Sequence, residues 1–72
     1  MSRDQMLTDL SDLRDRIAQA RVELEQLERD RDRLMVAADQ AATPVKWITE
    51  SAGVSRSRFY QVKDQMQKAA ES

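Results

Sequence analysis

The side chains best equipped for chemistry are hydrogen-bond donors gathered between residues 55 and 63. An arginine fork can bind a phosphate or a guanine edge through two hydrogen bonds, and a glutamine amide can pair with an adenine edge. The donors are Ser55, Arg56, Ser57, Arg58, Tyr60, Gln61 and Lys63, and no acidic residue interrupts them. Such a run indicates recognition of an anionic partner, with a merely solvated charged surface as the ordinary alternative.

The composition argues against catalytic and metal-binding sites. The chain has no His and no Cys, so it offers no zinc-ligand set, no thiol nucleophile and no disulfide framework. Its single Gly rules out a glycine-rich phosphate loop. We therefore expect no enzyme activity, no cofactor, no metal and no small-molecule substrate.

Charge is unevenly divided along the chain. Residues 1–42 carry 7 Lys/Arg against 10 Asp/Glu, a balance of −3, whereas residues 43–72 carry 5 against 3, a balance of +2; together they give the net charge of −1. Only the C-terminal part suits a polyanion. No stretch of about 18 apolar residues occurs, and the N-terminus lacks the apolar core of a signal peptide. We expect a cytoplasmic, nucleoid-associated protein with no membrane partner.

Apolar residues recur at alternating spacings of three and four along residues 6–41. In this heptad frame the a positions are Leu10, Ile17, Leu24, Arg31 and Ala38, and the d positions are Met6, Leu13, Ala20, Leu27, Leu34 and Ala41. This pattern predicts a coiled coil, and its stripe needs a partner helix. We expect a homodimer held by Met6, Leu10, Leu13, Ile17, Ala20, Leu24, Leu27 and Leu34.

One helix is predicted to run from about Arg3 to about Ala42, roughly 60 Å at 1.5 Å per residue. Ser2 and Gln5 fit a capping box at its start. Arg31 interrupts the stripe at an a position, where it either extends its head to solvent or selects register and partner.

The sequence leaves the orientation of the dimer open. In a parallel dimer the flanking charge pairs are one attractive and two repulsive: Asp9–Arg14, Arg16–Arg21 and Glu23–Glu28. An antiparallel dimer sets Arg16 near Glu23 but Asp9 near Asp30. Neither arrangement is clearly favoured.

The remaining residues predict two shorter helices. Thr43 is a suitable N-cap with a proline directly after it, so the second helix should span about 44–51. Gly53 supplies a tight turn, because glycine readily adopts positive φ. Ser55 is a suitable N-cap for a third helix over about 56–69.

The spacing of apolar residues around this turn follows a known pattern. With Val45 as the first position, the fourth, eighth, ninth, tenth, fifteenth and eighteenth positions are Ile48, Ala52, Gly53, Val54, Phe59 and Val62. The segment resembles the helix-turn-helix of tetracycline-repressor-type regulators and of resolvase/invertase recombinases. The resemblance covers about 20 of the 72 residues, and it implies binding of double-stranded DNA, with the last helix entering the major groove.

The resemblance also assigns roles to individual residues. The groove-facing side of the last helix would carry Ser55, Arg56, Ser57, Tyr60 and Gln61, with Arg56 reading guanine and Gln61 adenine. Phosphate contacts would come from Lys46, Ser55, Arg58, Tyr60 and Lys63.

A helix-turn-helix needs a third helix to close its core, and only the end of the long helix is available. We expect Met35, Ala37, Ala38 and Ala41 to pack on Ile48 and Phe59. Thr49 departs from the usual alanine, so its branched side chain must fit against the last helix. Trp47 should pack near Leu34, Met35 and Ala38, with a phosphate or dimer contact as the alternatives.

Taken together, these observations predict an all-α fold. Residues 1–42 would form the coiled-coil helix, whose end is the first helix of a trihelical head, and residues 43–72 the helix-turn-helix. The expected function is that of a homodimeric, sequence-specific DNA-binding protein, either a transcriptional regulator or an accessory factor of phage or plasmid type. The alternative is a coiled-coil protein-interaction module without DNA binding.

Overall fold

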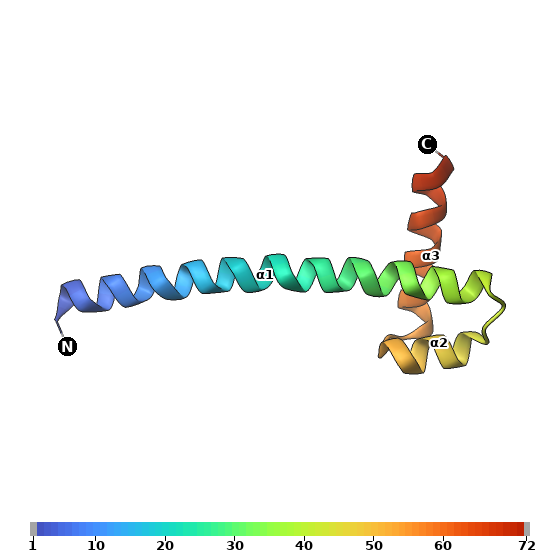
Figure 1. Ribbon diagram of the computed structural model, residues 1–72, viewed down its shortest axis with the longest axis horizontal. Coiled ribbons are helices and arrows are strands. Elements are labelled where there is room, and N and C mark those ends of the chain that lie inside the picture. Colours follow the sequence, from blue (N-terminus) through green and yellow to red (C-terminus); the bar gives the residue numbers. More distant parts are fainter. Residues whose placement is uncertain (1, 72) are drawn as a thin grey trace.

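The computed structural model describes the backbone of residues 2–71 and the side chains of residues 2–70. It contains three helices and, within those residues, no strand: α1 spans Arg3–Gln40, α2 Val45–Ala52 and α3 Arg56–Glu71. The all-helical class and the long N-terminal helix are thus confirmed. Figure 1 shows α1 as a rod with α2 and α3 packed at its C-terminal end. The chain measures 59 × 30 × 17 Å.

The start of α1 follows its sequence signal in part. The Ser2 hydroxyl accepts a hydrogen bond from the Gln5 backbone N–H at 3.2 Å. The Gln5 side chain does not return to Ser2 but donates to Asp9 Oδ1, 2.9 Å away. The capping box is therefore half formed.

The end of α1 comes two residues earlier than predicted, at Gln40. Ala42 adopts a left-handed conformation with φ 63°. Its N–H donates to the Asp39 carbonyl at 3.0 Å, and the N–H of Thr43 donates to the Ala38 carbonyl at 3.1 Å. These bonds form a Schellman motif, which satisfies the last carbonyls of the helix but normally places glycine where Ala42 stands.

The start of α2 also differs from the prediction. Pro44, with ψ 134°, is the N-cap, so neither Thr43 as cap nor Pro44 as first helical residue is correct. The reason is that only φ is fixed by the proline ring, and its extended ψ keeps Pro44 outside the helix. No side chain caps α2; the Pro44 carbonyl accepts from the N–H of Trp47 and Ile48.

The core joins all three helices through a small apolar cluster. Its buried members are Met35 of α1, Ile48 of α2, and Phe59 and Val62 of α3, surrounded by Val36, Ala38, Val45, Ala52, Val54 and Met66. The expected packing of Ala37 and Ala41 is wrong, because both are exposed. At about 100° per residue, Ala37 lies on nearly the opposite side of α1 from Met35.

Most of α1 lies outside this core. The described chain has a radius of gyration of 18.6 Å, against about 11 Å for a compact domain of this length. Met35 is the one residue of α1 that is buried. Every residue predicted to hold a dimer together is exposed in the single chain, up to 65% for Leu27 and 71% for Leu34.

Ala42→Gly should stabilise the protein. Glycine removes the Cβ strain of the left-handed conformation, and it gives back part of that gain through a more flexible unfolded chain. We expect a net gain of about 0.5–1 kcal/mol in the free energy of unfolding, measured by urea denaturation at equal protein concentration.

Ala41→Gly is the matched control, since Ala41 has an ordinary φ of −82°. There the added flexibility should lower stability instead. Equal effects of the two substitutions would contradict the left-handed turn at Ala42.

Candidate nucleic-acid interface

The start of α3 is fixed by Ser55. Its hydroxyl accepts from the Arg58 backbone N–H at 3.1 Å, and its carbonyl accepts from the Phe59 N–H at 3.0 Å. Ser55 is therefore the N-cap predicted from the sequence. The first turn of α3 contains no acidic residue, so the partial positive charge of the helix N-terminus is uncompensated there.

The buried face of α3 defines its outer face. Phe59 and Val62 point into the core, and at about 100° per residue the opposite side carries Ser57 and Gln61. Arg56 and Tyr60 project from one flank of that side and Arg58 from the other. Every candidate binding residue between Ser55 and Gln61 is exposed. The structure thus presents these donors around one end of α3.

The five cations of the segment 43–72 divide into two groups. Lys46, Arg56 and Arg58 make no ion pair with any described residue, whereas Lys63 and Lys68 are paired. Unpaired arginines keep their full donor capacity for a ligand. The free positive charge is therefore at the start of α2 and the start of α3.

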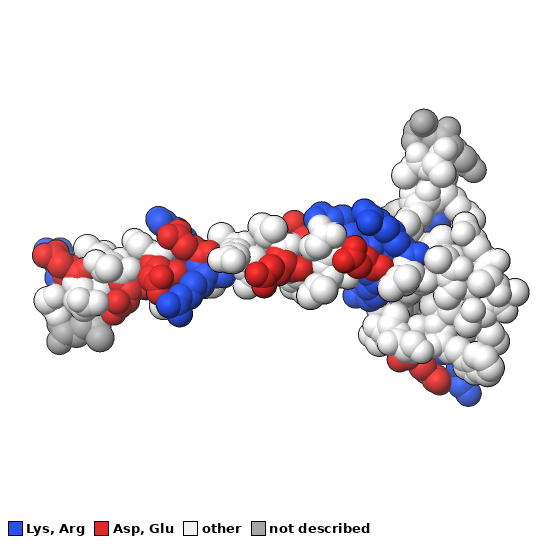
Figure 2. All heavy atoms as spheres, viewed as in Figure 1, with Lys and Arg blue, Asp and Glu red and all other residues white. Residues whose placement is uncertain are grey.

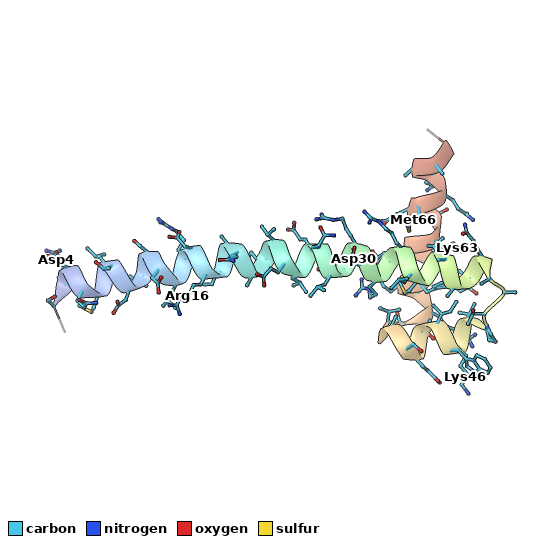
Figure 3. All side chains as sticks on the ribbon, in the orientation of Figure 1. Asp4, Arg16, Asp30, Lys46, Lys63 and Met66 are labelled. Atoms are coloured by element: carbon cyan, nitrogen blue, oxygen red, sulfur yellow. The ribbon has the colours of Figure 1, made fainter. Side chains whose placement is uncertain are left out.

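Lys63 does not belong with the other candidates. Its Nζ lies 2.9 Å from Asp39 Oδ2 on α1, and both side chains are largely covered. Figure 3 shows Lys63 beside the end of α1, away from Lys46. This ion pair ties α3 to α1, which is a packing role that a sequence without contacts does not reveal.

Asp64 is a residue of this face that the sequence reasoning missed. It follows Gln61 by three positions and therefore lies on the same side of α3. Lys68 Nζ pairs with its Oδ2 at 3.0 Å. The spacing from Gln61 was the available signal, and it places a carboxylate on the outer face, one turn beyond the donors.

The turn between α2 and α3 depends on Gly53. Its φ of 69° and ψ of 33° are left-handed, and its N–H donates to the Thr49 carbonyl at 2.9 Å. Apart from Gly53 itself and its two chain neighbours, no atom lies within 4 Å of the position that a Cβ would take. Thr49 is buried, and its hydroxyl donates to the Lys46 carbonyl at 3.1 Å.

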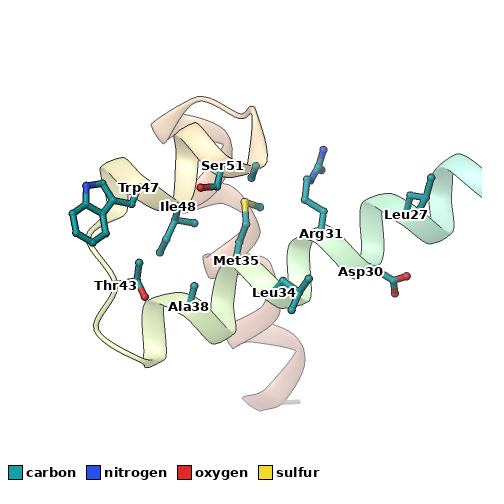
Figure 4. A pocket seen from close by; sticks show the side chains of 11 residues that line it. Leu27, Asp30, Arg31, Leu34, Met35, Ala38, Thr43, Trp47, Ile48 and Ser51 are labelled. Carbon is teal, nitrogen blue, oxygen red and sulfur yellow. The ribbon is translucent and has the colours of Figure 1, made fainter.

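A second surface feature is an apolar groove between α1 and α2 (Figure 4). It encloses about 750 Å³ and is lined by Leu27, Asp30, Arg31, Leu34, Met35, Ala38, Thr43, Trp47, Ile48, Ser51 and Ala52. Trp47 lines the same groove as Leu34, Met35 and Ala38, but the expected packing is wrong, because 62% of the residue remains exposed. The tryptophan is thus a wall of an open groove and not a core residue.

Along α1 the surface alternates in charge. Figure 2 shows acidic and basic side chains interspersed over the rod, and pairs such as Arg16–Asp12 at 3.1 Å and Arg14–Asp15 at 3.2 Å lie within the helix. On the face shown, basic side chains gather only toward the C-terminal end of the rod, so most of this face offers no continuous positive strip to a polyanion.

Comparison with known proteins finds no match to a family model, to a curated protein or to a solved structure. Within residues 2–71, no helix has the length and apolarity needed to cross a bilayer. The described residues also contain no group of three or more acidic, His or Cys side chains placed to hold a metal ion.

Gly53→Val should disrupt the α2–α3 turn by conformational strain alone, since the Cβ would meet no neighbour. We expect a loss of about 1–3 kcal/mol in unfolding free energy. Most helical circular dichroism should remain, because α1 lies largely outside the head. Gly53→Asn is the control, as asparagine tolerates this conformation and should cost clearly less. Equal losses would mean that φ does not govern this position.

Proposed function

We propose that this chain is a homodimeric, sequence-specific binder of double-stranded DNA, in which α2, the Gly53 turn and α3 act as a helix-turn-helix. The supporting observation is that Arg56 and Arg58 are exposed and have no acidic partner among the described residues, at the start of a helix whose other side is the core. A helix held in this way can enter a major groove N-terminus first.

Within this proposal the exposed side chains of α3 have different tasks. Arg56 stands in the first turn, where a guanidinium can reach the O6 and N7 atoms of guanine. Gln61, one turn further on the outer face, would read adenine, and Ser57 would contact either kind of base edge. Arg58 and the half-exposed Tyr60 would hold the phosphates on either side.

The first helix of the motif would cross the backbone. Lys46, exposed and unpaired within residues 2–71, lies in the first turn of α2. An ammonium group there suits a phosphate, which it binds as a point charge without reading sequence. Lys63 is left out of this set because it is held by Asp39.

Dimerisation completes the proposed site. A single short α3 offers few base contacts, whereas two heads on one dimer would recognise an inverted repeat. The stripe on α1 supports this, because exposed leucines at a and d positions are worth roughly 1.5–3 kcal/mol each when fully buried. Whether the dimer represses, activates or organises DNA depends on the target site.

The competing function, a coiled-coil protein-interaction module, is favoured by two observations. Asp64 places a carboxylate on the outer face of α3, and the exposed Trp47 borders an apolar groove. The two functions differ in salt dependence, because DNA binding weakens steeply with salt and apolar protein docking does not. Selection of bound sequences from random duplex DNA is the direct test: a recovered palindrome supports the proposal, and no enrichment contradicts it.

Arg56→Ala and Lys46→Ala should distinguish a residue that recognises bases from a residue that binds phosphates. Arg56→Ala is expected to cost about 1–3 kcal/mol on the selected site and to relax preference at one base pair. Lys46→Ala should weaken cognate and scrambled duplexes alike and reduce the salt slope by about one unit per head. Binding to both duplexes at several salt concentrations measures this.

Arg29→Ala, which removes an exposed cation of α1, is the control and should leave both affinities unchanged. Equal losses for Arg56→Ala and Lys46→Ala on both duplexes would indicate a non-specific clamp of architectural type. If neither variant loses affinity, DNA is not the partner.

Leu24→Asn with Leu27→Asn should convert the dimer into a largely unfolded monomer. The substitutions remove two apolar layers from a helix that has little other burial. Sedimentation and circular dichroism measure the change, with Val22→Asn as the control because Val22 is exposed outside the a and d positions. A folded wild-type monomer at micromolar concentration would contradict the proposed dimer.

A further inference from the structure

The groove between α1 and α2 continues the coiled-coil stripe. Leu27 and Leu34, both d positions, belong to the stripe and also line the groove, with Arg31 and Ala38 as the a positions between and after them. Figure 4 shows Leu27 and Leu34 on α1 at this surface and Trp47 on α2 at its far end. A helix that covers the stripe of α1 therefore runs directly into the groove.

Two charged side chains line the groove, the basic Arg31 and the acidic Asp30. Arg31 donates through Nε and Nη2 to Asp32 Oδ1 and is 28% exposed in its side chain. Asp30 is contacted at Oδ1, by Gln26 at 3.1 Å and by Arg33 at 3.9 Å. Nη1 of Arg31 and Oδ2 of Asp30 take part in none of these contacts, so each side chain retains capacity for a partner across the groove.

We propose that this groove receives α1 of a second copy of the chain in a parallel, in-register dimer, in which Arg31 of each copy pairs with Asp30 of the other. This rests on the proposed homodimer and adds its orientation and its polar contact. In a parallel coiled coil, an a residue lies beside the preceding g residue of the partner helix. Arg31 is an a residue and Asp30 is that g residue, so the two Arg31 side chains meet in one a layer and an Asp30 carboxylate flanks each of them.

The antiparallel alternative lacks this complementarity. There Arg31 would lie opposite Met6 of the second copy, and Asp30 would lie near its Asp9, which places two carboxylates together. Among the residues that count against the parallel form, Arg16, Arg21 and Glu23 are exposed, so water and salt screen them, whereas Glu28 is partly covered. Arg31 is also partly covered, and its attraction to Asp30 is repeated on both sides of the dimer, which favours the parallel orientation.

Near the head, helix α2 covers the e-position side of the coiled-coil stripe on α1. Met35 stands at an e position, which normally faces the partner, but here it is buried beneath α2. The surface that meets the second copy at this level is therefore α2, with Trp47 and Ser51 on the groove. Ala37, the g residue one heptad after Asp30, is exposed and small, so α2 of the other copy can approach closely there. Trp47 should lose exposure when the dimer forms.

Charge reversal tests the pair. Asp30→Arg alone and Arg31→Asp alone should each weaken dimerisation roughly tenfold, because like charges then meet across the groove. The double variant Asp30→Arg/Arg31→Asp should restore it, and an equimolar mixture of the two single variants should form heterodimers preferentially. Glu25→Arg, an exposed charge change at a b position outside the groove lining, is the control. Analytical ultracentrifugation of the full chain measures each dissociation constant.

Single cysteines test the orientation, and the chain has none of its own. Leu10→Cys should form a disulfide with itself in a parallel dimer, because facing d and a layers bring their Cα atoms within about 7 Å. In an antiparallel dimer Leu10→Cys would instead cross-link to Leu27→Cys. The emission of Trp47, the only tryptophan, should shift to shorter wavelength on dimerisation and become less accessible to acrylamide.

The outcomes separate this inference from the proposed function. If Asp30→Arg dimerises more tightly than the wild type, or if Leu10→Cys cross-links only to Leu27→Cys, the dimer is not parallel. The proposal that a homodimer binds DNA is not affected by that result. If acrylamide quenches Trp47 as well in the dimer as in the monomer, α1 of the second copy does not occupy the groove. If the charge-swap and cross-linking tests succeed but the wild-type dimer binds no duplex DNA, the proposed function is overturned and the present inference is supported.

Discussion

The packing of Phe59 against Met35 and Ile48 is the contact on which the rest of the structure depends. Phe59 is fully buried, and these three residues bring one side chain from each helix into a single cluster. Burial of a side chain of this size contributes roughly 1.5–3 kcal/mol, and the whole head has only four such residues. The turn at Gly53, the cap at Ser55 and the ion pair of Lys63 set the angles around this cluster, but none of them could hold α3 in place without it.

That small core explains the distribution of charge on the head. Lys63 and Asp39 meet at the edge of the cluster and are largely covered, so their charge serves packing between α1 and α3. Arg56 and Arg58 stand outside it and meet no acidic residue in the described chain. Within residues 43–72 the free positive charge therefore lies at the starts of α2 and α3, where the proposed DNA contact lies.

The helices and most of the core could be predicted from the sequence, because each had a local cause. The heptad spacing and the absence of Gly and Pro predicted α1, and the spacing of Ile48, Phe59 and Val62 predicted the cluster. The predictions were wrong where two local signals competed for the same residues, or where a tertiary contact determined the role of a side chain. The sequence predicted Thr43 as the cap and Pro44 as the first residue of the second helix, but the N–H of Thr43 takes part in the Schellman motif that ends α1 and Pro44 is extended. Of the candidate site, the exposed donors of α3 were predictable from helical periodicity; the capture of Lys63 by Asp39 was not, since no pattern relates residues 24 positions apart.

The unbroken passage of α1 from stripe to core has a consequence for regulation. Leu34 faces the proposed partner and its neighbour Met35 faces the core, and no hinge separates them, since α1 is continuous through Gln40. Unpairing the two copies would fray the helix from which the core takes Met35, so assembly and head folding are thermodynamically linked. Under this linkage the concentration of the chain regulates its own activity. Below the dissociation constant of the dimer, the heads would lose both their partner and part of their fold. Occupancy of a DNA target would therefore rise with a power of the chain concentration greater than one.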